Sequence, residues 1–98
     1  MRPKEAGCYL LHFAAPVKGG QHYLGWSVDI KRRMRVHLAG RGARLVRQAL
    51  RAGVNVELVR VWADADQRQE RVLKRKGTPK GYCPICTEAK RRRTAQRD

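Results

Sequence analysis

The feature that most restricts the fold of this chain is a pair of short apolar runs joined by a segment rich in Pro and Gly. Residues 8–15, CYLLHFAA, are too few for a typical helix, and residues 22–27, HYLGWS, form a second run with aromatic side chains. The intervening PVKGGQ is typical of a turn, so the two runs predict a β-hairpin. Strand alternation allows Tyr9 and Tyr23 to face the same way.

The next segment, SVDIKRRMRVHLAGRG, has the pattern of an amphipathic helix. Ser27 or Asp29 can cap its start, and Gly40 can end it. The apolar stripe of this helix consists of Ile30, Met34 and Leu38. His37 falls inside the stripe and Arg33 at its edge, so we expect both to point inward. Arg33 can equally lie along the rim of the stripe with its charge in water.

The rest of the chain predicts two more helices and a third strand. Residues 43–53 form a short amphipathic pattern, and the β-branched run at 54–62 predicts a strand that is well buried. From Asp64 to residue 76 the chain again has helical character, with Asp64 or Asp66 at its N-terminal end. Glu70 lies at the border of the buried face of that helix.

A large excess of positive charge indicates the kind of partner. The 98 residues suffice for one domain with a modest core, and 23 Lys and Arg against 8 Asp and Glu give a formal net charge of +15. Such a chain favours a polyanion, and we expect nucleic acid, most simply DNA. The arginines predicted to face outward and contact phosphates are Arg32, Arg35, Arg41, Arg44, Arg47 and Arg51. A solvated basic surface and a ribosome-associated protein without chemistry are the alternatives.

Membrane and export signals are not evident in the sequence. No apolar run approaches the roughly 20 residues needed to span a bilayer, so we expect no membrane partner. Glu5 and His12 interrupt the pattern of a secretory signal. An odd number of cysteines, two of them in a close CPIC pair, favours a reducing, cytoplasmic setting.

The CPIC pair has two interpretations. Cys83 and Cys86 supply half of a tetrahedral zinc site, and the other half would come from Cys8, His12, His22 or a second chain. Alternatively, the segment is a turn whose thiols pack against the sheet.

Five residues in order resemble the functional set of the GIY-YIG nuclease superfamily. GCY, ending at Tyr9, resembles the first family signature, and YLG, beginning at Tyr23, the second. DIKRRMRVH is similar to the family's Arg-apolar-x-x-His helix, which assigns Arg33 and His37. ERVLKR resembles the segment with the metal-binding glutamate, which assigns Glu70.

The resemblance covers roughly residues 6–76. It implies a small single-domain member with an α/β (α+β) fold, in which helices flank a three-stranded, mainly antiparallel sheet. We place this domain at 1–82, followed by the CPIC turn and a basic, flexible tail at 83–98. Cys8 and Leu24 stand where the family usually has isoleucine, and no residue matches the polar residue that closes the domain in many members.

The resemblance implies a metal-dependent endonuclease. Glu70 would hold one Mg²⁺ or Mn²⁺, and Arg33 would bind the phosphate. Tyr9 would position or deprotonate the attacking water with support from Tyr23. His37 would relay the proton or hydrogen-bond a tyrosine.

Two alternatives accompany this hypothesis. Glu70 can be a surface residue that pairs with Lys74 one turn later. The whole chain can be a basic nucleic-acid-binding protein that keeps the fold without catalysis.

Overall fold

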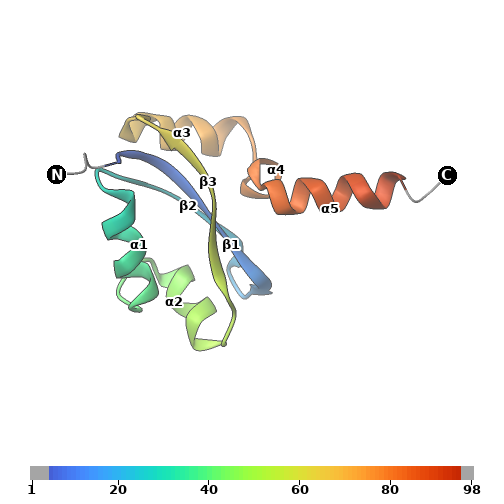
Figure 1. Cartoon of the computed structure of the whole chain (residues 1–98), viewed down its shortest axis with the longest axis horizontal. Helices are drawn as coiled ribbons and strands as arrows, with labels where there is room; N and C mark the ends of the chain where they lie inside the picture. Colours follow the sequence, from blue (N-terminus) through green and yellow to red (C-terminus); the bar gives the residue numbers. More distant parts are fainter. Residues whose placement is uncertain (1–4, 96–98) are drawn as a thin grey trace.

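The computed structural model describes residues 5–95 and contains one three-stranded sheet with helices packed on both faces (Figure 1). The elements in chain order are β1 (Gly7–Val17), β2 (Gly20–Ser27), α1 (Ile30–Leu38), α2 (Arg44–Arg51), β3 (Val56–Ala63), α3 (Gln67–Lys76), α4 (Pro79–Tyr82) and α5 (Pro84–Ala95). Within the described part of the chain, no helix combines the length and the apolar character needed to cross a membrane.

The strand order is β2-β1-β3, and both pairings are antiparallel. The sheet and its flanking helices confirm the predicted fold class. The hairpin register aligns Tyr9 with Gly25 and Leu11 with Tyr23, so both tyrosine side chains lie on one face of the sheet. Because β1 has a strand on each side and helices above and below, every residue from Gly7 to Phe13 is buried.

Alternation along β1 divides the core into two clusters. The cluster that faces α1 and α2 consists of Tyr9, Leu11, Phe13, Ile30, Val46 and Ala49. On the other face, Leu10 packs with Leu24 and Cys83, and Leu73 of α3 and Tyr82 of α4 pack against this group. The tyrosine of the first signature therefore faces α1 and α2, whereas α3 lies behind the sheet.

Aspartate caps define the starts of two helices. The carboxylate of Asp29 accepts a hydrogen bond from the backbone N–H of Arg32 at 3.2 Å. Asp66 accepts one from the N–H of Gln69 at 3.0 Å in the same way. The N-cap residues are therefore Asp29 rather than Ser27 for α1, and Asp66 rather than Asp64 for α3. Beyond the end of α1, Gly40 takes a φ of 78°, a conformation that glycine adopts without strain.

Two expectations about burial are wrong. The third strand was expected to be well buried, but β3 is an edge strand on which Leu58 and Arg60 are exposed. Leu38 was expected in the apolar stripe, but it is 54% exposed because it is the last residue of α1, where the chain turns away. The buried residues of that helix are Ile30 and His37.

The C-terminal segment leaves the sheet as a helix. Figure 1 shows α5 extending away from the rest of the molecule, after α4 has returned to the sheet. Cys83, between these two helices, is fully buried. The domain boundary between residues 82 and 83 and the flexibility of the tail stay predictions, and residues 96–98 lie outside the described residues.

Candidate functional site

Four of the five family-like residues converge between the sheet and α1, and we call Tyr9, Tyr23, Arg33 and His37 the tyrosine cluster. The hydroxyl oxygen of Tyr9 lies 2.7 Å from Nε2 of His37, and both side chains are fully buried. The Tyr23 ring centroid is 6.1 Å from that of Tyr9 and 5.3 Å from that of His37. Arg33 completes the cluster, because its guanidinium lies near both tyrosine hydroxyls, and its interactions with Tyr9 first and then Tyr23 raise its pKa.

The two partners of His37 determine its tautomer. Nδ1 accepts a hydrogen bond from the backbone N–H of Ala43 at 3.3 Å, so a neutral ring carries its proton on Nε2. Nε2–H then donates to the Tyr9 oxygen. Burial, together with the charge of Arg33, lowers the pKa of His37 from 6.5 to about 4, so the ring is neutral at physiological pH. Of its two predicted roles, hydrogen bonding to a tyrosine is the one that this geometry provides.

The environment of Tyr9 keeps its hydroxyl protonated. Burial raises the pKa of Tyr9 to about 12, although the hydrogen bond with Arg33 opposes part of the rise. On the order of one molecule in 100,000 would carry the phenolate at neutral pH. Because the Tyr9 oxygen accepts from His37, Tyr9 keeps its own proton for donation. Tyr9 is therefore suited to hold neighbouring groups in place rather than to deprotonate water.

Two glycines allow the aromatic rings to pack this closely. A Cβ atom on Gly25 would lie 2.8 Å from atoms of both Tyr9 and Tyr23. A Cβ atom on Gly42 would overlap the imidazole of His37. The glycine of YLG and the second glycine of GRG therefore have a steric role at the tyrosine cluster.

Glu70 lies apart from this cluster. It is on α3, behind the sheet, where its carboxylate accepts a hydrogen bond from Nζ of Lys74 at 2.8 Å. The pKa of the Cys8 thiol is raised, mainly by burial and then by the charge of Glu70, so the carboxylate is near Cys8. Cys8 and Tyr9 are consecutive on β1 and point to opposite faces. The ion pair between Glu70 and Lys74, which was one of the two alternatives for Glu70, is thus present. Glu70 and the tyrosine cluster lie on opposite faces of the sheet.

The six arginines expected to contact phosphates are all exposed. They belong to α1, α2 and the connection between them, which form the layer over the tyrosine cluster. Among the described side chains, ion pairs join Lys74 to Glu70 and Arg92 to Glu88, and neither pair involves these six arginines, which we call the arginine layer. The positive charge of the layer is accessible to a polyanion.

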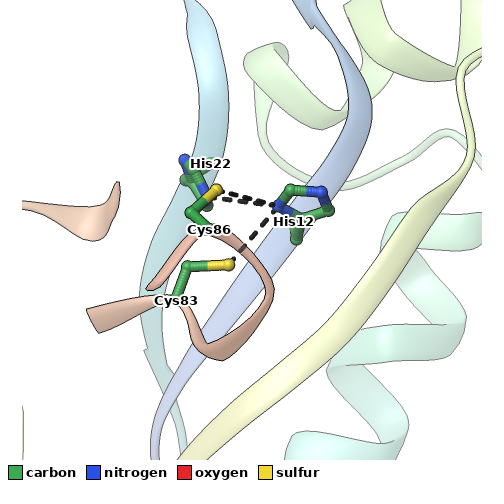
Figure 2. A group of neighbouring side chains, drawn as sticks. All are labelled: His12, His22, Cys83 and Cys86. Atoms are coloured by element: carbon green, nitrogen blue, oxygen red, sulfur yellow. Dashed lines mark hydrogen bonds between the residues drawn. The ribbon is translucent and has the colours of Figure 1, made fainter. Parts of the chain in front are cut away.

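A second group of side chains, which we call the His/Cys cluster, consists of His12, His22, Cys83 and Cys86 (Figure 2). One nitrogen or sulfur atom from each residue lies within 4.8 Å of the corresponding atoms of the others. The sulfur of Cys83 is fully buried near the imidazole of His12, at 3.4 Å from its Nδ1. Burial lowers the pKa of His22, and the positive charges of His12 and Lys80 lower it further.

The donor atoms of this cluster are nitrogen and sulfur. Zinc prefers such donors in proteins, whereas Mg²⁺ prefers oxygen. Among the described residues, this cluster is the group of three or more His, Cys, Asp or Glu side chains whose spacing suits a metal ion. Its nitrogen and sulfur donors differ from the oxygen donors that the expected Mg²⁺ prefers. Sequence reasoning included His12 and His22 among several candidates. Their direct pairing in the hairpin register is the signal that could have selected both.

Comparisons of this chain with models of protein families, with curated proteins and with solved structures found no match. The similarity to the GIY-YIG superfamily therefore depends on the ordered residues alone and stays a prediction.

Proposed function

We propose that this protein binds nucleic acid through its arginine layer and hydrolyses phosphodiester bonds at the tyrosine cluster, as the GIY-YIG nucleases that it resembles do. The observation that carries the proposal is the position of Arg33, which is half-buried, close to two tyrosines and flanked on its helix by the exposed Arg32 and Arg35. Taking a guanidinium partly out of water is unfavourable unless an anion compensates. A phosphate matches its planar, permanently charged fork.

The cluster residues would have different tasks. Arg33 would bind a phosphate oxygen, and Tyr23, which is half-buried, would contact the phosphate or the attacking water. Tyr9 and His37 are fully buried behind them, so we assign both as positioning residues. The His37–Tyr9 hydrogen bond would fix the Tyr9 ring, and Tyr9 would in turn fix Arg33.

Glu70 is the proposed ligand for Mg²⁺ or Mn²⁺. Its side chain is 25% exposed, and a single carboxylate completed by water and substrate phosphate is a common way of holding Mg²⁺. Because Glu70 and the tyrosine cluster lie on opposite faces of the sheet, the substrate would have to pass around the sheet edge for a cation held there to neutralise charge on its phosphate. The ion pair with Lys74 must open for this, and one carboxylate binds weakly, so we expect metal affinity to depend on bound nucleic acid.

A second candidate function is nucleic-acid binding without catalysis. The observation that favours it is the separation of Glu70, behind the sheet, from a Tyr9 that is fully buried in front of it. In that case the arginine layer would bind phosphates, and the tyrosine cluster would be a packed polar core.

Metal-dependent cleavage by the full chain separates the two functions. The substrates are supercoiled plasmid, branched DNA and structured RNA, each with Mg²⁺ or Mn²⁺. We expect wild type to cleave at least one substrate and Glu70→Ala to lose that cleavage. Glu88→Ala is the matched control, because Glu88 forms the same i,i+4 ion pair, with Arg92, at a distant site. If wild type and Glu70→Ala were equally inactive on every substrate while binding persisted, the non-catalytic function would replace the enzyme.

A further inference from the structure

We propose that the His/Cys cluster is a closed, structural zinc site that attaches the C-terminal helix to the hairpin. The proposal goes beyond the nuclease function and does not depend on it. Its evidence is the position of four side chains of the two types, His and Cys, that zinc prefers, brought together from segments 61 to 74 residues apart in sequence.

Four of the six distances between the ligand atoms match a zinc tetrahedron, and all six are within 4.8 Å. Zinc bonds of the usual lengths place two nitrogens about 3.3 Å apart, and a nitrogen about 3.6 Å from a sulfur. Nδ1 of His12 lies 3.2 Å from Nε2 of His22. Cys83 Sγ lies 3.4 Å from Nδ1 of His12, and Cys86 Sγ lies 3.8 Å from the same atom and 3.4 Å from Nε2 of His22. Each of these four edges is within 0.2 Å of the tetrahedral value.

Each half of the site comes from a local structure that presents two ligands together. His12 and His22 are direct partners across the β1–β2 ladder, so their side chains emerge side by side on one face. Cys83 precedes α5, and Cys86 lies in its first turn, after the Pro84 that begins the helix. Figure 2 shows the two sulfurs approaching the two imidazoles from the α4–α5 segment.

The site has the properties of a structural rather than a catalytic zinc centre. Four protein ligands leave no position for water or substrate. Cys83 is fully buried and His12 only 9% exposed, so the ion would be largely shielded from solvent. Deprotonation of two thiols would balance the charge of the zinc ion, and binding would release two protons. None of the three cysteines is in a disulfide, so both thiols are available to bind metal.

The mechanical role of the site is to position α5. The preceding helix, α4, is already attached to the domain by other contacts, because the Tyr82 hydroxyl donates to the Leu73 carbonyl at 2.6 Å and Arg60 donates to the Tyr82 carbonyl at 3.2 Å. α5 extends from the sheet in Figure 1 and is anchored at its start by Cys86. Zinc would therefore fix the direction in which this basic helix leaves the domain.

The test is the metal content of the full chain, purified reduced and without chelator. We expect one zinc ion per chain, and cobalt in its place should give the intense visible absorption of a tetrahedral site with thiolate ligands. Cys86→Ser and His22→Gln should lower zinc affinity by more than the roughly 10–100-fold typical of losing a partner hydrogen-bonded behind a ligand. Both positions are only half-buried, so these variants should fold.

Cys8→Ala is the matched control, since Cys8 is a buried cysteine outside the cluster. It should keep one zinc ion per chain. A reduced wild type that neither contains zinc nor takes it up would overturn the proposal, as would a Cys8→Ala protein that loses as much zinc as Cys86→Ser. Because the measurement is metal content, neither result depends on whether the protein cleaves nucleic acid.

Discussion

At the scale of single residues, the hydrogen bonds of His37 decide what Tyr9 can do. Nδ1 accepts from Ala43, so Nε2–H donates to the tyrosine, while burial raises the pKa of Tyr9 to about 12. The sequence could place both residues on inward faces, because strand and helix periodicity predict this. It could not predict the tautomer, which depends on an N–H six residues beyond the histidine.

The first prediction concerns the close approach at Gly25. In Gly25→Ala, the new methyl group would meet Tyr9 and Tyr23, so we expect a loss of roughly 1–3 kcal/mol in the free energy of unfolding. Urea denaturation measures this loss. Gly81→Ala is the control, because its Cβ would meet only the hydroxyl of Thr78 at 3.2 Å. Equal stabilities of the two variants would show that the rings do not pack as described.

The second prediction concerns pH. The folded pKa of His37, about 4, lies below its unfolded value of 6.5, so the unfolded chain takes up an extra proton as the pH falls between these values. The contribution of this group is complete above about pH 6.5 and declines toward pH 4, by on the order of 3 kcal/mol.

Urea unfolding of wild type and His37→Gln across this pH range measures the effect. Glutamine does not titrate, so the stability difference between the two proteins should shrink as the pH falls. Other histidines contribute equally to both proteins. A difference that stays constant with pH would mean that His37 is not buried in its neutral form.

At the scale of the elements, some features follow from local sequence and others from the sheet. The hairpin was predictable, because its turn residues and alternation are local. The partial burial of β3 was not predictable, because a β-branched sequence is compatible with both a central strand and an edge strand. The His/Cys cluster was only half predictable, since the CPIC pair and the pairing of His12 with His22 are local, but the meeting of the two pairs depends on the return of α4 to the sheet.

The third prediction concerns the cap of α1, the helix that presents Arg33 and His37. Asp29→Ala removes the acceptor for the Arg32 N–H and should lower the free energy of unfolding by about 1 kcal/mol. Thermal or urea unfolding measures the loss. Asp29→Ser keeps a side-chain acceptor and should restore most of the stability. A serine variant no more stable than the alanine variant would argue against the cap.

At the scale of the whole molecule, the two faces of the sheet have different chemistry. The front face carries the tyrosine cluster beneath the exposed arginines of α1 and α2. The back face carries α3 with Glu70, and the His/Cys cluster where the C-terminal segment meets the hairpin. Net charge predicted a polyanionic partner. Only the fold shows that the six arginines share the layer over the tyrosine cluster.

The fourth prediction concerns the salt dependence of binding to duplex DNA. Each lost phosphate contact should make the slope of log affinity against log salt less steep by about 0.9. Replacing Arg44 and Arg47 with glutamine should therefore change the slope by about 2. The control replaces Arg75 and Lys76, two exposed cations at the C-terminal end of α3 behind the sheet, and should leave the slope unchanged. Equal changes in both double variants would show that binding is not directed by the arginine layer.

The most direct test of the account is the single-turnover cleavage rate of Arg33→Ala beside that of Arg35→Ala, with protein in excess over its substrate. Both variants lose one arginine from α1, but Arg33 contacts the tyrosines and Arg35 faces solvent. We predict that Arg33→Ala slows cleavage by about 100-fold or more, whereas Arg35→Ala stays within about threefold of wild type. Equal rates in the two variants would contradict a phosphodiester-cleaving site at the tyrosine cluster.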